Sequence, residues 1–192
     1  MVRTLSNGKT KDVRYRLADA LEECMKEVPL DKVTVRQITG KCGVSRQTFY
    51  RNFTDKYGLL NWYFDELLEK AFQHMGCGNT AYDSLVHKFT YIRDEKLFFK
   101  AAFKNDSQEN LRDHDIQMII GFYRNLISGK TGTFPEERYG GLLEMYCVAS
   151  VHMTQQWVLK GCKTSPQDMA KLMIDAMPPK LSGLFSELGI LD

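Results

Sequence analysis

The sequence predicts an all-α protein with a small N-terminal three-helix domain and a larger helical domain. Three observations support this fold class: apolar residues recur at helical spacing, glycine and proline breaks separate the segments, and no segment alternates convincingly as a strand. We place the predicted boundary after residue 56, which gives domains at residues 1–56 and 57–192.

The first long helix carries one apolar stripe and ends before Pro29. Residues at positions i, i+4, i+8, i+11, i+12 and i+15 share one helical face, as expected for an amphipathic helix packed on a core. In this sequence that face consists of Val13, Leu17, Leu21, Cys24, Met25 and Val28.

A short helix is predicted next, over residues 34–41. Thr34 and Gln37 have the spacing of a capping box, in which each side chain binds the other residue's backbone N–H. Val33 and Val35 alternate with polar residues, so a short strand is the alternative at this point. We favour the helix, because no partner strand is predicted nearby.

A second short helix follows a glycine-containing turn, with Ser45 as its N-cap, and continues to about Asn52. Two short helices joined in this way form a helix-turn-helix unit, whose second helix can enter the major groove of DNA. Arginine suits guanine and glutamine suits adenine. The predicted base contacts are Arg46, Gln47 and Arg51.

Hydrogen-bond donors around this helix are suited to the phosphates of double-stranded DNA. Phe49 is predicted to face inward while its neighbour faces the DNA backbone, which explains two adjacent aromatic residues in this segment. The predicted phosphate contacts are Thr34, Ser45, Thr48, Tyr50, Asn52 and Lys56.

Charge is distributed unevenly along the chain. The net charge is +2, but residues 1–60 contain 12 Lys and Arg against 7 Asp and Glu, which gives +5. The remaining residues contain 14 against 17, which gives −3. The basic first third therefore favours a polyanionic partner for the N-terminal domain alone.

Several classes of protein are disfavoured by the sequence. No apolar run approaches the roughly 18 residues of a membrane span, and the N-terminus lacks the apolar core of a signal peptide, so we expect a cytoplasmic protein. No nucleophile elbow, phosphate-binding glycine loop or carboxylate pair indicates an enzyme. His74 and Cys77 are a lone pair without zinc-site spacing, so neither a metal nor another cofactor is expected.

The run "ITGKCGVSRQTFYRNFTDK", together with Leu59, resembles the DNA-binding signature of TetR/AcrR-family transcriptional regulators. Thr39, Cys42 and Asn52 depart from the usual residues but are small or retain a hydrogen-bond donor. The resemblance implies a ligand-responsive homodimer that binds an inverted-repeat operator, by default as a repressor. A second run, "WVLKGCKTSPQDMAKLM", resembles a subgroup that includes activators of dihydroxyacetone-kinase operons, which implies an activator.

The same resemblance implies that the second domain binds a small-molecule effector and dimerises through its last two long helices. An effector pocket could be formed by Phe98, Phe99, Phe103, Met118, Phe122, Tyr123 and Tyr146. The dimer interface could be formed by Ala149, Ser150, Met153, Trp157, Met169, Leu172, Met173 and Ala176.

Both sets have a simpler interpretation, in which these side chains only fill the core of the monomer. The alternative function is a helical co-regulator that binds a protein partner and no longer binds DNA specifically. The intact set of DNA-facing donors argues against that alternative.

Overall fold

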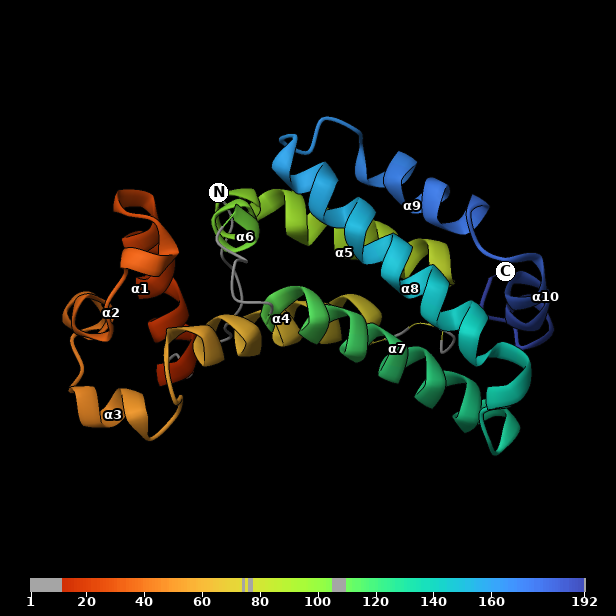
Figure 1. Cartoon of the computed structure of the whole chain (residues 1–192), viewed down its shortest axis with the longest axis horizontal. Coiled ribbons are helices and arrows are strands. Elements are labelled where there is room, and N and C mark those ends of the chain that lie inside the picture. Colours follow the sequence, from red (N-terminus) through yellow and green to blue (C-terminus); the bar gives the residue numbers. More distant parts are fainter. Residues whose placement is uncertain (1–11, 74, 76–77, 105–109, 192) are drawn as a thin grey trace. The chain divides into compact units, whose positions relative to one another are not determined.

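The computed structural model describes residues 12–73, 75, 78–104 and 110–191 (Figure 1). Within these residues the chain forms ten α-helices and one short 3-10 helix, and its only β-pairing is an isolated bridge between Met75 and Asn79. The prediction of an all-α fold is confirmed. The helices are α1 (Val13–Glu27), η1 (Leu30–Lys32), α2 (Val35–Cys42), α3 (Arg46–Tyr50), α4 (Lys56–Phe72), α5 (Ala81–Asp94), α6 (Lys96–Lys104), α7 (Asn110–Thr131), α8 (Glu136–Leu159), α9 (Pro166–Asp175) and α10 (Pro179–Glu187).

The chain divides into two compact units, which we call unit 1 (residues 1–64) and unit 2 (residues 65–192). The division falls within α4, a continuous helix, and not at its start. The boundary predicted from the sequence, after residue 56, falls at the first residue of this helix. Each unit is described below by itself.

In unit 1, α1 packs against α2, and α2 packs against α3. The predicted capping box is present: the Thr34 side chain accepts from the Gln37 N–H at 3.3 Å, and the Gln37 side chain accepts from the Thr34 N–H at 2.8 Å. The alternative of a short strand at Val33 and Val35 is therefore wrong. Gly43 ends α2 in the left-handed conformation with φ at 70°, which favours glycine and allows the tight turn into α3.

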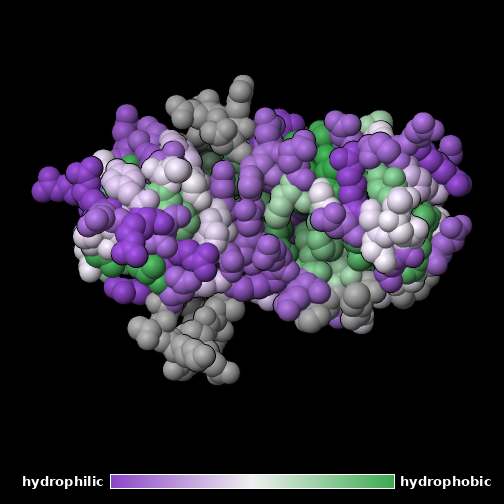
Figure 2. Space-filling view, turned by 90° about the horizontal axis from the view of Figure 1, so that it is seen from below, coloured by the Kyte–Doolittle hydropathy of each residue, from purple (hydrophilic) through white to green (hydrophobic). Residues whose placement is uncertain are grey.

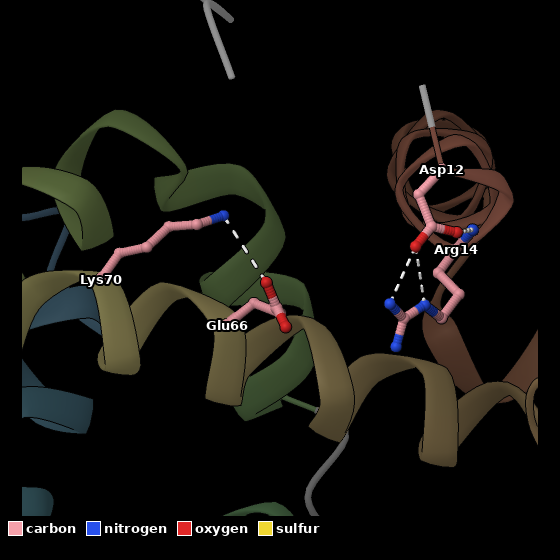
Figure 3. Close-up of polar contacts among 4 residues, drawn as sticks. All are labelled: Asp12, Arg14, Glu66 and Lys70. Atoms are coloured by element: carbon pink, nitrogen blue, oxygen red, sulfur yellow. Dashed lines mark hydrogen bonds and ion pairs between the residues drawn. The ribbon is translucent and has the colours of Figure 1, made fainter. Parts of the chain in front are cut away.

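A chain of aromatic contacts links the helices of unit 1. Phe49 contacts Phe53 with ring centroids 5.9 Å apart, Phe53 contacts Trp62 at 5.5 Å, and Trp62 contacts Tyr15 at 5.1 Å. At the start of α1, Arg14 binds the carboxylate of Asp12 through two side-chain nitrogens, as Figure 3 shows. These contacts join α1, α3 and the first half of α4 into one small domain.

In unit 2, α5 packs closely against α9, while α6, α7 and α10 each pack against α8 (Figure 1). The α4 segment of this unit carries an i,i+4 ion pair between Glu66 and Lys70 (Figure 3). The sequence did not predict α10, although Pro179 in its first turn and the apolar spacing of Leu181, Leu184 and Phe185 are typical of a helix.

None of the helices in the described ranges combines the length and the apolar character that a bilayer span needs.

Candidate functional site

The exposed side of α3 is held in place by its cap and by one buried ring. The Ser45 hydroxyl accepts from the Thr48 N–H at 3.1 Å and so begins the helix, as predicted. Phe49 is completely buried, whereas its neighbours Gln47 and Tyr50 are exposed. Residues of hydrophilic character cover most of the side of unit 1 visible in Figure 2. Burying Phe49 therefore fixes which side of α3 faces solvent.

Three side chains on this helix have unused hydrogen-bond donors. Arg46, Gln47 and Arg51 are exposed, and none of their side chains makes a hydrogen bond or ion pair within the part of the chain that the structure describes. Tyr50 is 51% exposed, and its ring packs edge-on against Phe49 at 5.6 Å. These groups can bind an incoming ligand without first breaking an internal contact.

The other predicted phosphate contacts also have structural roles. The Asn52 amide donates to the Thr48 carbonyl at 2.7 Å, and the Ser45 and Thr48 hydroxyls lie 3.0 Å apart. Thr34 serves the capping box at the start of α2. Their backbone and hydroxyl groups thus set the positions of α2 and α3 as well as presenting donors.

Lys56 holds the loop that precedes α2. Its ammonium donates to the carbonyl oxygens of Asp31 and Val33, each at 2.8 Å. Burial lowers the pKa of this lysine, and the nearby Asp31 carboxylate partly offsets that effect. Arg16 has a comparable role on the other side of unit 1, where its guanidinium donates to the Cys42 carbonyl at 2.7 Å and so caps the end of α2.

Unit 2 contains a small cavity, about 10 Å³ in volume, which is enough for roughly one water molecule. Of the predicted pocket residues, Tyr123 and Tyr146 line it. Phe98, Phe99, Phe103, Met118 and Phe122 are not among its lining residues. Phe98, Phe99 and Phe103 are buried side chains of α6, and Phe122 stacks on the lining residue Phe72. The lining residues are Phe72, Leu85, Lys88, Phe89, Ile119, Tyr123, Tyr146, Cys147, Ser150, Thr154 and Met173.

Sequence reasoning missed two buried charged residues of unit 2: Lys88, which lines the cavity, and Asp115, which does not. Lys88 is 3% exposed, and its ammonium lies 5.8 Å from the ring centroids of both Phe72 and Phe89. Asp115 is fully buried, and neither carboxylate oxygen has a hydrogen-bond partner among the described residues. The sequence contained a signal for both residues. Lys88 follows Leu85 by three positions and Asp115 precedes Ile119 by four, so each charged residue shares a helix face with an apolar one.

Burial shifts the pKa of both groups toward the neutral form. It lowers the pKa of Lys88, against the attraction of Asp115. It raises the pKa of Asp115 from 3.8 to about 6, although Lys88 and His114 act in the opposite direction. Buried charges that lack full compensation reduce stability, so the presence of Lys88 in the cavity lining points to a function there.

The predicted interface set separates into exposed and buried members. Ala149, Met153, Leu172 and Ala176 are exposed, and Met145 beside them is 72% exposed. Trp157, Met169 and Met173 are buried within unit 2, where the Trp157 indole donates to the Thr164 carbonyl at 3.0 Å. These three residues, and Ser150, which lines the cavity, offer little surface to a partner subunit.

Within the described residues, no group of three or more histidine, cysteine or acidic side chains could hold a metal ion. His74 and Cys77 lie outside the described residues.

Two family models match the chain. One, for bacterial regulatory proteins of the tetR family, matches residues 17–62, and one for a transcriptional regulator C-terminal region matches residues 79–178. No curated protein sequence matches the chain.

Several solved structures share the fold. The dihydroxyacetone kinase operon activator DhaS has a TM-score of 0.62 at 16% identity, covering 95% of this chain and 99% of its own. The fatty acid degradation regulator FadR from Bacillus halodurans has a TM-score of 0.58 at 20% identity, covering 86% and 94%. The TetR family repressor AlkX from Dietzia sp. strain DQ12-45-1b has a TM-score of 0.51 at 14% identity, covering 96% and 99%.

The helix-turn-helix in unit 1, followed by a separate helical unit, defines a DNA-binding transcriptional regulator and not an enzyme. The chain belongs to the tetR family of bacterial regulatory proteins. Members of this family bind DNA and small ligands and act as dimers. The similarity to DhaS, FadR and AlkX concerns the fold alone at these identities.

We expect Lys56→Met to lower the free energy of unfolding by about 1–3 kcal/mol, because two carbonyl groups lose a charged donor. Urea denaturation of the full chain measures this change. Lys32→Met is the matched control, since Lys32 is 74% exposed and makes only a 3.5 Å ion pair with Asp31. Equal effects of the two substitutions would contradict a structural role for Lys56.

We expect Asp115→Asn to stabilise the protein at neutral pH and to lose this advantage in acid. The pKa of Asp115 is raised from its usual 3.8 to about 6 in the folded protein. The charged carboxylate therefore costs no stability below pH 3.8, and this cost grows with pH until it is complete above about pH 6. A shift of this size corresponds to about 3 kcal/mol. Urea denaturation at about pH 8 and about pH 4 tests this, with the exposed Asp113→Asn as control; a pH-independent difference would refute it.

Proposed function

We propose that the protein is a homodimeric, effector-responsive transcriptional regulator that reads an inverted-repeat operator with α3. The observation that carries this proposal is the set of exposed, unpartnered donors at Arg46, Gln47 and Arg51 on a helix anchored by buried Phe49. In the major groove, an arginine can bind guanine bidentately and a glutamine can bind adenine. Each subunit would read one half-site, with the half-sites about one helical turn apart.

Phosphate contacts would flank this reading helix. Tyr50 has an exposed hydroxyl, and the capped ends at Thr34 and Ser45 present backbone N–H groups of α2 and α3. Thr48, Asn52 and Lys56 complete the proposed set, in addition to their internal hydrogen bonds. Because such contacts fix register and not sequence, they would contribute to binding on any DNA.

The proposed dimer interface is the exposed apolar side of α8 and α9. Met145, Met153 and Leu172 are large apolar side chains at 72%, 44% and 44% exposure, and Ala149 and Ala176 lie on the same helices. Small residues allow a second helix to approach closely, and large exposed apolar residues gain from burial. The α8 and α9 helices of a second subunit would cover both the large and the small residues of this surface.

An effector would bind in the cavity of unit 2 and change the affinity for DNA. A ligand alters an equilibrium between two conformations only to the extent that it binds one of them better. The cavity is lined by residues of α4, α5, α7, α8 and α9, so filling it acts on the helices that build this unit. Repression and activation are both compatible with this scheme, and binding to the chromosome agrees with the cytoplasmic location expected from the sequence.

We expect an inverted repeat to be enriched when the protein selects from fragmented genomic DNA of the source organism near physiological salt. Arg46→Ala should weaken binding to that site by about 1–3 kcal/mol and relax one base position in each half-site. Tyr50→Phe should instead weaken binding to all sequences alike. Enrichment without a common motif would favour the alternative of a co-regulator that acts through a protein partner.

We expect Leu172→Asp to convert dimers into monomers, because a charge would be buried at the interface without a partner. Light scattering after size-exclusion chromatography measures the molar mass. Leu97→Asp is the control, since Leu97 is 60% exposed and belongs to α6, which is not one of the two proposed interface helices. If both variants remain dimeric, the interface lies elsewhere.

A further inference from the structure

Lys88 is the only charged residue among those that line the cavity of unit 2. Its ammonium makes no hydrogen bond and no ion pair within the described residues, and its neighbours at 5.8 Å are the faces of two phenylalanine rings. A lysine ammonium has three N–H donors, and a buried donor without an acceptor is costly. The cavity therefore offers an incoming molecule a positive charge with unused donors.

Asp115, the carboxylate that attracts Lys88, makes neither an ion pair nor a hydrogen bond with it in the described residues. Asp115 attracts Lys88 electrostatically, but no ion pair within 4.0 Å joins them, and both Asp115 oxygens lack hydrogen-bond partners in the described part of the chain. Two buried, opposite charges that do not meet leave both groups poorly compensated. A ligand that accepts hydrogen bonds from Lys88 would remove one of these deficits.

We propose that the cavity binds a small aliphatic monocarboxylate, whose carboxylate accepts hydrogen bonds from the Lys88 ammonium. This inference rests on the proposed effector role of the cavity. Leu85, Phe89 and Ile119 provide an apolar surface for the aliphatic part. A phosphate dianion fits less well, because the lining provides one cation and Asp115 nearby is negative.

The size of the cavity limits the ligand. About 10 Å³ holds roughly one water molecule, so even a short carboxylate requires the lining side chains to move. Met173 and the aromatic side chains can change rotamer, and methionine adapts to irregular spaces at low cost. Each additional methylene needs further rearrangement, so chains of a few carbons are the class that fits.

Asp115 would couple this binding to proton uptake. A second carboxylate bound at Lys88 would offset the attraction that Lys88 exerts on Asp115, so the ligand raises the pKa of Asp115 further above its value of about 6 in the free protein. The groups that act on Asp115 come from every neighbouring helix: Lys88 from α5, Cys147 from α8, His114 from α7 and Asp65 from α4. Affinity should therefore fall up to about tenfold per pH unit above about pH 6.

The first experiment is a calorimetric titration of the full wild-type chain with the sodium salts of straight-chain acids from acetate to hexanoate. The neutral primary amide of each acid serves as its control, because it retains the shape and removes the charge. We expect at least one carboxylate to bind roughly tenfold or more tightly than its amide. Equal binding of acid and amide, or no saturable carboxylate binding up to about 10 mM, would overturn the proposal.

Two substitutions then test the residues. Lys88→Met should weaken carboxylate binding roughly 30-fold or more, whereas Lys171→Met, on the exposed side of α9, should leave it unchanged. Asp115→Asn should retain binding but lose its dependence on pH between about 6 and 8. Unchanged affinity in Lys88→Met would refute the site, and pH dependence that persists in Asp115→Asn would refute the coupling.

DNA binding of the same variants separates this proposal from the proposed function. If carboxylates bind through Lys88 but leave DNA affinity unaltered, the ligand site stands and the regulatory role of the cavity is refuted. If a neutral compound changes DNA affinity while carboxylates do not bind, the regulatory role stands and the anionic ligand class is refuted.

Discussion

The burial of Phe49 is the constraint on which the arrangement of unit 1 depends. A helix of five residues, such as α3, is too short to be stable by itself. Its orientation comes from the fully buried ring of Phe49, which contacts Phe53. Phe53 in turn contacts the indole of Trp62 in the long helix α4. Because Phe49 must face inward, Arg46, Gln47 and Tyr50 face outward. These exposed donors, which we propose face DNA, are thus oriented by the hydrophobic contact of Phe49.

Unit 2 shows the opposite balance, since it buries charged groups that cost stability. An apolar residue at the position of Lys88 would pack against Phe72 and Phe89 without desolvating an ammonium. Asp115 likewise has no hydrogen bond from the described residues to offset its burial. Unit 1 keeps the donors of Arg46, Gln47 and Arg51 at the surface, where water can hydrate them. Unit 2 buries polar groups of its own, and a ligand rather than water would have to satisfy them.

The sequence predicted the local features of this fold better than its long-range contacts. The caps at Thr34 and Ser45 and the inward direction of Phe49 follow from spacing along a few residues, and the structure contains them. The cavity depends on which of several aromatic faces meet across helices, and helical spacing alone does not determine this. Phe98 and Tyr146 both lie on apolar faces, yet only Tyr146, whose hydroxyl donates to the Met173 carbonyl at 2.9 Å, reaches the cavity. Helical spacing also does not separate Trp157, which is buried, from Met153, which is exposed on the same helix.

One helix carries residues of both sites. At its start, Lys56 holds the loop before α2 through two carbonyls; further along, Asp65 binds His114 at 2.7 Å; at its end, Phe72 lines the cavity. His114 is next to Asp115 in α7, so the partner of Asp65 and the buried, unpaired carboxylate belong to the same turn. Within unit 2, the Asp65–His114 contact and the cavity residue Phe72 therefore share the helix α4.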